Sequence, residues 1–369
     1  MSNDDYQIYF DCGFSKLRAG AFIKGDVKKN FYIESKFLFD HTKIDLEIQK
    51  IIIFLEKKTH QYIDNINLMI DSPKMMSIGI SISKKIDDIK VRQNDIQFLV
   101  QEAKQIILKN YKNKNINHII INNYKINNIN YDYLPLNIKC NFISLDILFI
   151  CLPEETIEYF KSFFHKFNIS INQVTCCSYA KAMNYKDNFS LNKDISFVDI
   201  GFNKTSIVTF INNKITSLNV LPVGGNHITK DISKVLKINH EKAENLKIYF
   251  NKNETFLNDK EFSSELIHKI IFARIEEILE ICSQFIRLNL DTADQYKIIL
   301  LGEGSKILNN KCNIELSFKS DIDFLEETGE DIFQSSSKLI SGLNKQEVAI
   351  IPKKQSKQGI FERLFHLFN

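Results

Sequence analysis

The sequence predicts an α/β fold built from two related halves, with an inserted region and a C-terminal amphipathic helix. The segment 6–35 reads as a strand, a turn at Asp11-Cys12-Gly13, a second strand and a third strand. The same order returns in "DISFVDIGFNKTSIVTFINNKITSLNVLPVGG", where a strand ends at Asp199 and the chain turns at Gly201. Glycine and short polar residues favour tight hairpin turns. Two copies of strand, Asp-x-Gly and hairpin therefore indicate two halves of similar fold.

Helices and a further strand fit around these hairpins. Apolar residues recur at a spacing near 3.6 in 45–63, 93–111 and 263–290, which is typical of amphipathic helices. The stretch "QYKIILLGEGSKI" predicts a buried strand that runs into a glycine-containing turn. Residues 112–145 differ from their surroundings, because short apolar runs there are separated by Asn-rich turns. We therefore expect an inserted α+β region over 82–166.

Composition excludes several classes of protein. A chain of 369 residues can form more than one domain, and its 44% hydrophobic and 25% charged residues are ordinary for a globular protein. The net charge of +3 gives no reason to expect a nucleic-acid partner. We expect no signal peptide and no membrane-spanning helix, because the N-terminus is acidic and no long apolar run occurs. The seven cysteines form no CxxC pair, which favours buried thiols in a reducing cytoplasm.

The glycine motifs form a recognisable set: two Asp-x-Gly hairpins, Gly224-Gly225, and the late "LGEGS". This set resembles the phosphate and adenosine loops of the actin-like ATPase superfamily. Within it, "LPVGGNHITKDISKVLKINHEKAENLKIYF" and "ARIEEILEI" are similar to the FtsA family of bacterial cell-division proteins, and "GIFERLFHLFN" resembles the membrane-targeting helix of that family. The resemblance implies an actin-like (ribonuclease-H-like) two-domain fold with a nucleotide cleft.

The resemblance also implies a division into six parts. They are a first actin-like core (1–81 and 167–193), an inserted FtsA-type subdomain (82–166), a second actin-like core (194–226 and 289–343), a helical subdomain within it (227–288), a flexible linker (344–358) and a membrane-targeting helix (359–369).

A nucleoside triphosphate between two domains needs backbone N–H groups at tight turns, because small residues let the main chain approach phosphate closely. Carboxylates at strand ends can hold Mg²⁺ through water, since this ion keeps most of its hydration shell. Asp11 and Asp199 stand at such strand ends and are the expected Mg²⁺ residues. The two phosphate turns would comprise Gly13, Phe14, Ser15 and Lys16, and then Gly201, Asn203, Lys204 and Thr205. Either turn alone would pass for an ordinary hairpin.

The resemblance assigns the adenosine side to three further segments. Gly224, Gly225 and Asn226 open a helix, whose N-terminus favours phosphate and ribose oxygens. Glu244 and Lys247 lie three residues apart on the next helix, so both can face one cleft, although alone they would be read as a surface ion pair. Gly302, Gly304 and Ser305 would let the adenine ring pass the backbone.

Several residues depart from the family pattern. Phe14 and Phe202 stand where the family has small residues, and Glu303 stands where a third glycine is usual. In "QVTCCSYAKA", which resembles the helix that links the two halves, Ser178 replaces a common proline and Lys181 a common small residue. The motif set predicts nucleotide binding, and these departures predict at most slow ATP hydrolysis. No catalytic residue can be named.

The C-terminal segment is amphipathic. On a helical wheel at about 100° per residue its apolar side chains share one side. These are Ile360, Phe361, Leu364, Phe365, Leu367 and Phe368. Lysines at 353, 354 and 357 precede them, which favours a helix lying on an anionic membrane surface; the alternatives are a helix that folds back on the body or one that pairs with a partner protein. Such a short helix binds weakly alone, and a filament would add avidity.

The resemblance implies a division protein that binds ATP and Mg²⁺, polymerises, and tethers the ring of tubulin-like FtsZ to the cytoplasmic face of the inner membrane at the division site. Its expected partners are the FtsZ C-terminal peptide, further copies of itself, anionic lipid, and later division proteins that meet the inserted subdomain. Three alternatives stay open. They are an ATP-dependent small-molecule kinase, a pilus-assembly adaptor of the same superfamily, and a degenerate adaptor that binds no nucleotide.

Overall fold

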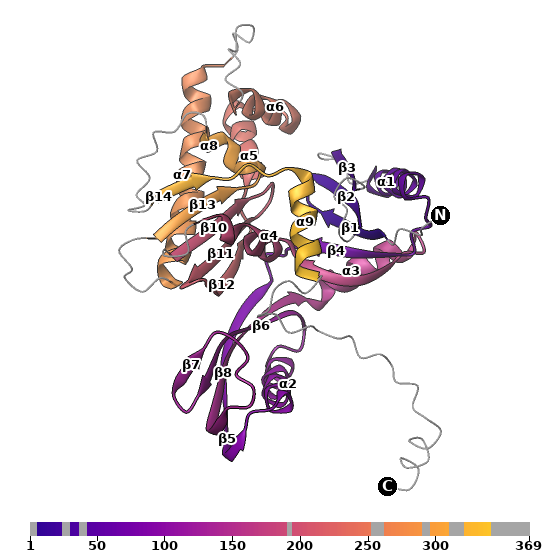
Figure 1. Cartoon of the computed structure of the whole chain (residues 1–369). Coiled ribbons are helices and arrows are strands. Elements are labelled where there is room, and N and C mark those ends of the chain that lie inside the picture. Colours follow the sequence, from indigo (N-terminus) through magenta and orange to yellow (C-terminus); the bar gives the residue numbers. More distant parts are fainter. Residues whose placement is uncertain are drawn as a thin grey trace.

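The computed structural model describes residues 6–23, 30–36, 43–189, 194–251, 262–289, 296–309 and 321–340. Two five-stranded sheets with their helices form the body, and a third sheet projects from it (Figure 1). The linker expected at 344–358 and the amphipathic helix expected at 359–369 lie outside the described residues. The described helices include none that is both long and apolar enough to cross a membrane.

The first sheet has the strand order β3-β2-β1-β4-β9. Its strands are β1 (Tyr6–Cys12), β2 (Lys16–Ile23), β3 (Phe31–Lys36), β4 (Asn65–Ile70) and β9 (Ser170–Cys176). The first three strands are antiparallel, while β4 and β9 run parallel to β1. Helix α1 (Ile44–Thr59) packs on this sheet because Ile48, Ile51 and Leu55, spaced by three and four residues, form one buried stripe. Helix α3 (Glu154–His165) packs beside β9.

The second sheet repeats this topology with the order β12-β11-β10-β13-β14. Its strands are β10 (Asp194–Ile200), β11 (Thr205–Ile211), β12 (Lys214–Leu221), β13 (Tyr296–Leu301) and β14 (Asp321–Phe324). Again an antiparallel meander is extended by two parallel strands. The prediction of an α/β fold with two related halves is therefore confirmed.

Two groups of helices complete the body. Helices α4 (Cys177–Tyr185) and α9 (Gly329–Ile340) pack against each other and lie between the two sheets (Figure 1). A 3₁₀ turn, η3 (Lys186–Asn188), follows α4. The second group comprises α5 (Gly225–Leu236), α6 (His240–Asn251), α7 (Ser264–Asn289), the 3₁₀ turn η4 (Glu303–Ser305) and α8 (Lys306–Asn309). Helices α5 to α8 share one core with β10 and β13.

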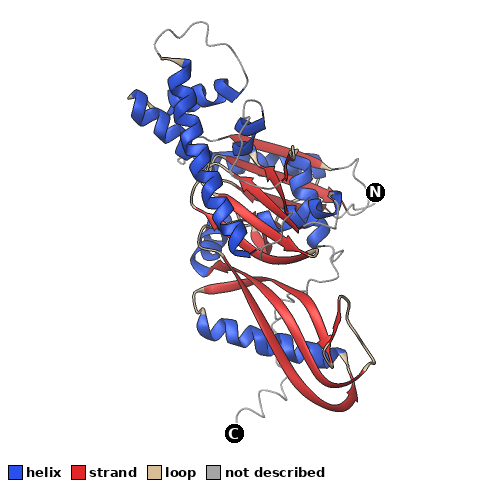
Figure 2. Cartoon of the chain, turned by 90° about the vertical axis from the view of Figure 1, so that its left-hand side faces the viewer, coloured by secondary structure: helices blue, strands red, loops and turns tan. Residues whose placement is uncertain are grey.

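The third sheet has the order β5-β8-β6-β7, and one helix covers it (Figure 2). Its elements are β5 (Met76–Lys90), α2 (Gln93–Asn110), β6 (Lys114–Ile126), β7 (Ile129–Tyr131) and β8 (Lys139–Pro153). Strands β6 and β8 are longer than the short strands expected at 112–145, whereas β7 is short. They turn at Asn127 and Asn128, whose positive φ angles asparagine tolerates.

The limits of this inserted sheet differ from the expected 82–166. Strand β5 leaves the first core at Met76, and β8 returns to it at Pro153. Helix α3 belongs to the first core, because Phe164 packs edge-on against Phe10 at 5.3 Å between ring centroids. The inserted sheet therefore spans 76–153 in the structure.

Candidate functional site

A polar cleft lies where the two cores meet, and residues of both sheets line it. The main cavity measures about 390 Å³. Its walls include Asp11, Gly13, Ser15, Lys16, Arg18, Asp71, Lys181, Asp199, Gly201, Lys204, Gly302, Glu303, Ser305 and Glu327. A second cavity of about 330 Å³ shares Ser15, Lys16, Gly201 and Glu303 with it and reaches Gly225, Glu244, Lys247 and Gly304. The structure thus brings most of the predicted binding residues to one place.

Two turns of matching geometry face this cleft. The Gly13 amide donates to the Lys16 carbonyl at 3.0 Å, and the Gly201 amide donates to the Lys204 carbonyl at 2.9 Å. At each glycine a Cβ atom would stand 3.0 Å from the same carbonyl, which is tighter than an ordinary contact. The two Asp-x-Gly copies recognised in the sequence therefore form the same type of turn.

The start of α5 holds the second turn rather than offering its first amides to a ligand. The Gly225 amide donates to the Gly201 carbonyl at 2.9 Å, and the Asn226 amide donates to the Phe202 carbonyl at 2.7 Å. Gly224 permits this approach, because a Cβ there would lie 2.5 Å from the Gly201 carbonyl oxygen. The expectation that these amides meet phosphate is therefore wrong, since backbone carbonyls already occupy them.

Glu244 and Lys247 form a buried polar cluster under the second cavity. Lys247 Nζ donates to Glu244 Oε2 at 2.7 Å, to Thr229 Oγ1 at 2.9 Å and to the Gly225 carbonyl at 3.1 Å. Burial lowers the pKa of Lys247, and Glu244 opposes this shift. The pair is thus not a surface ion pair, and it fixes the floor of the second cavity.

The loop after β13 closes the cleft from the second core. Gly302 has a φ of +85°, and the Ser305 hydroxyl donates to its carbonyl at 2.7 Å. A Cβ on Gly225 would stand 3.9 Å from the Cα of Gly304. The absence of side chains at Gly225 and Gly304 lets the two backbones approach closely, and the second cavity beside them is a slot large enough for a flat ring.

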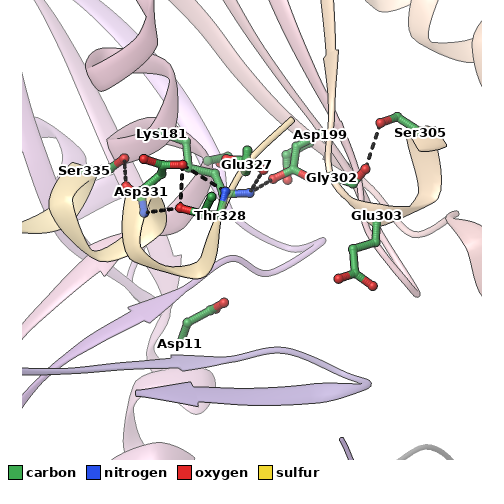
Figure 3. Close-up of polar contacts among 12 residues, drawn as sticks. Asp11, Lys181, Asp199, Gly302, Glu303, Ser305, Glu327, Thr328, Asp331 and Ser335 are labelled. Carbon is green, nitrogen blue, oxygen red and sulfur yellow. Dashed lines mark hydrogen bonds and ion pairs between the residues drawn. The ribbon is translucent and has the colours of Figure 1, made fainter. Parts of the chain in front are cut away.

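Both expected metal-binding carboxylates are paired with cations of the chain. Arg18 Nη1 donates to Asp11 Oδ2 at 2.8 Å. Lys181 Nζ donates to Asp199 Oδ2 at 2.6 Å and to Glu327 Oε2 at 2.8 Å, so its ammonium lies between two carboxylates (Figure 3). Burial alone would lower the pKa of Lys181, but Asp199 and Glu327 raise it well above its usual value. Burial raises the pKa of Glu327, and Lys181 opposes that shift.

A second charge cluster crosses the mouth of the cleft. Lys16 pairs with Glu303 from the opposite core and with Glu34 at 3.1 Å. Burial opposes ionisation of Glu34 and Glu303, yet the hydrogen bonds from Lys16 and the nearby positive charges lower the pKa of both. Glu303, which departs from the family pattern, thus links the two cores.

Sequence reasoning missed several residues of the cleft. Asp71 follows β4. Its carboxylate accepts a hydrogen bond from the Ser178 amide at 3.1 Å, and its backbone carbonyl accepts one from Lys204 at 2.8 Å. Glu327 precedes a helix start, where Thr328 and Asp331 cap each other's amides at 3.2 and 2.9 Å. The "Asp after a strand" at 71 and the Thr-x-x-Asp before α9 are signals that could have indicated them. Arg18, Glu34, Lys36, Ser206 and Lys306 also line the main cavity.

Five predicted residues, Gly224 among them, are not among the described residues that line the two cavities. Phe14 is 45% exposed and lines a separate apolar cavity beside Phe160. The buried Thr205 donates to the Val223 carbonyl at 2.8 Å, and Asn226 donates to Asn203 at 2.7 Å. These contacts stabilise the second turn from behind. Phe202, by contrast, lines the second cavity, with Lys247 Nζ 6.0 Å from its ring centroid.

The residues fit a nucleotide better than they fit a metal ion. Glycine turns, a slot for a flat ring, and lysines at 16, 36, 204 and 306 suit a polyphosphate and a purine. Hydrated Mg²⁺ needs carboxylate oxygens that are free to accept from its water shell. At Asp11 and Asp199 the facing oxygens already accept from Arg18 and Lys181. Among the described residues no group of three His, Cys, Asp or Glu side chains could hold a metal ion.

Comparisons with known proteins identify the second core most strongly. Residues 196–343 match the model of the family described as "Cell division protein FtsA". The FtsA of Bacillus subtilis (strain 168) is 39% identical over 111 residues, which cover 26% of this chain and 25% of that protein. The FtsA of Buchnera aphidicola subsp. Schizaphis graminum is 24% identical over 276 residues, which cover 70% of this chain and 63% of that protein. The chain thus spans a quarter to under two thirds of these relatives.

The fold has a counterpart among solved structures. A chain of the "PilM-PilN type IV pilus biogenesis complex" superposes with a TM-score of 0.58 at 12% identity, covering 89% of this chain and 90% of that chain. At this identity the likeness concerns the fold alone. The resemblance expected from the sequence is therefore confirmed: residues 196–343 match the FtsA cell-division family model, on a chain with the actin-like fold.

Proposed function

We propose that this chain is an actin-like division protein that binds ATP in its central cleft, assembles with copies of itself, and tethers the FtsZ ring to the cytoplasmic face of the inner membrane. One observation carries the proposal. The segment that matches the FtsA model supplies the second wall of the cleft, including the turn at Gly201 and the loop at Gly302–Ser305. The second core would thus contact both the nucleotide and the division partner FtsZ.

Different residues of the cleft would contact the phosphates and the purine of ATP. The turns at Gly13 and Gly201 present main chain to the phosphates, and Lys16, Lys204 and Lys306 supply positive charge. The second cavity, beside Gly225 and Gly304, takes the purine, with Glu244 and Lys247 below it. Asp11 and Asp199 are engaged by Arg18 and Lys181, so neither is free to activate water. At most slow hydrolysis follows from this pairing.

The remaining surfaces match the proposed partners. The helices within 227–288 would receive the C-terminal peptide of FtsZ, as in the family that the second core resembles. The third sheet (76–153) projects from the body and would meet neighbouring copies and later division proteins (Figure 2). The segment 359–369 would lie on anionic lipid at the division site. Because each such helix is short, assembly of the body would make the attachment firm.

Lys306→Ala should weaken ATP binding about tenfold without unfolding the protein. Lys306 is exposed and lines both cavities, so its replacement removes a charge near the phosphates but no buried contact. Isothermal titration with ATP would measure the change. Lys269→Ala is the matched control, because Lys269 is an exposed lysine of α7 paired with Glu265. Equal affinities in the two variants would contradict the proposed site.

Removal of residues 359–369 should abolish most sedimentation of the protein with vesicles that contain anionic phosphatidylglycerol. In the full chain, ATP should increase sedimentation, since filaments present many helices to one surface. Phe365→Asp should act like the truncation, because a carboxylate on the apolar side opposes insertion. Glu362→Gln, on the polar side, should retain binding. Equal sedimentation of the full chain and the truncated protein would disprove the proposed anchor.

A further inference from the structure

We propose that Lys181 and Arg18 take the place of the divalent metal ion in this cleft, so that the protein binds its nucleotide without Mg²⁺. The proposal rests on the nucleotide site proposed above and concerns the chemistry of the species bound there. It starts from the disagreement between the expected Mg²⁺ residues, Asp11 and Asp199, and the contacts that the two carboxylates make.

Lys181 is built into the base of the cleft rather than lying across it by chance. It projects from α4, between the two cores, and only 6% of its surface is exposed. Its ammonium contacts Asp199 Oδ2 at 2.6 Å and Glu327 Oε2 at 2.8 Å. Glu327 is positioned by the Thr328–Asp331 cap at the start of α9 (Figure 3). A small side chain at 181, which the family favours, would leave this space to a hydrated ion.

One oxygen of Asp199 is engaged by a cation, and the other is crowded by a loop. Oδ2 accepts from Lys181, while Oδ1 lies against the adenosine loop, 2.2 Å from where a Cβ of Gly302 would stand. This carboxylate therefore fits under the Gly302 backbone only because that residue has no side chain. A hydrated ion would have to displace Lys181 to reach this carboxylate from the cleft.

The other carboxylate is held in the same way from the first core. Asp11 is 8% exposed, and its Oδ2 accepts from Arg18 Nη1 at 2.8 Å. The guanidinium is itself fixed by Glu34, which accepts from Nε at 3.1 Å. Arginine stays charged at any physiological pH, so this pairing is permanent. A divalent ion between Asp11 and Asp199 would meet two resident cations and would have to displace them from the carboxylates.

Each member of the expected metal pair thus has a resident cation beside it before a ligand enters, and each cation is shared with a second carboxylate, Glu34 or Glu327. In a metal-dependent cleft, two free carboxylates repel the phosphates until the ion arrives. Here Arg18 and Lys181 reduce that repulsion without a diffusible ion, and Lys16, Lys204 and Lys306 remain at the wall of the same cavity. The cleft is therefore suited to the metal-free nucleotide.

Titration calorimetry of the full chain with ATP, once in excess Mg²⁺ and once in EDTA, tests this directly. The two dissociation constants should agree within about twofold, whereas a metal-dependent site loses tenfold or more in EDTA. Metal dependence in the natural protein would overturn the inference and leave the proposed function standing. Binding in neither condition would contradict the proposed function and this inference with it.

The variant Lys181→Met/Glu327→Gln sharpens the test. It removes the cation together with one buried carboxylate, so no new unpaired charge is left at Glu327, and its fold can be checked by its melting curve. Asp199 is then free, and ATP affinity should fall about tenfold in EDTA and recover with Mg²⁺. Lys269→Met, on the exposed face of α7, should remain indifferent to Mg²⁺. If the folded double variant bound ATP equally well in EDTA and in Mg²⁺, Lys181 would not stand in for the metal.

Discussion

Replacing Lys181 alone by methionine should lower the free energy of unfolding by about 3–5 kcal/mol at neutral pH. Methionine fills nearly the same volume, so the loss is electrostatic: Asp199 and Glu327 would face each other in a buried site without their shared cation. Removing one partner of a buried ion pair leaves an uncompensated charge that water cannot reach. Urea unfolding monitored by circular dichroism measures the change.

The loss of stability caused by Lys181→Met should depend on pH, and Glu327 sets whether it grows or shrinks as pH rises. Burial raises the pKa of Glu327 in the folded protein. A raised folded pKa means that the carboxyl group supports the fold below its ordinary pKa, and that this support is lost as pH rises through the folded value. Without Lys181 nothing opposes that loss, so the deficit of Lys181→Met should be larger at pH 8 than at pH 5.

An exposed lysine gives the matched control. Lys269 Nζ lies 2.7 Å from Glu265, almost the same distance as the buried pair, but the two side chains are 71% and 76% exposed. Lys269→Met should therefore change stability by no more than about 1 kcal/mol. If both variants unfolded at the same urea concentration, the buried network would not stabilise the protein.

The fold could be predicted from the sequence because its signals are local. Each Asp-x-Gly copy lies within one hairpin, and the helical stripes of α1, α2 and α7 extend over a single element, so spacing alone indicates them. The limits of the inserted sheet were harder. They depend on where β5 and β8 pair with each other, and pairing between strands far apart in the chain is not a local signal.

The site could be predicted only in part, because its charges come from elements far apart in the chain. The backbone features at Gly13, Gly201 and Gly302 were visible, since glycine stands where the chain must approach closely. The pairing of Lys181 with Asp199 and Glu327 was not, because α4, β10 and the loop before α9 meet only through tertiary packing. Carboxylates that looked free in the sequence are therefore paired in the fold.

Gly302→Ala should lower the free energy of unfolding by about 3 kcal/mol and weaken ATP binding as well. The residue has a φ of +85°, a conformation that alanine rarely adopts. The new Cβ would also stand 2.7 Å from the Ile200 carbonyl oxygen and 2.2 Å from Asp199 Oδ1. The backbone cannot yield cheaply, so the loop must move and take the Asp199–Lys181 contact with it.

Gly79→Ala is the control for this prediction, because Gly79 lies in β5 and a Cβ added there would meet open space out to 4 Å. Alanine there should leave stability unchanged or raise it slightly, since it reduces the freedom of the unfolded chain. Thermal unfolding and ATP titration of both variants would separate a strained loop from a general effect of replacing glycine. Equal behaviour of the two variants would mean that the loop at Gly302 tolerates a side chain, and the close packing of Asp199 beneath it would no longer explain why its carboxylate is closed to metal.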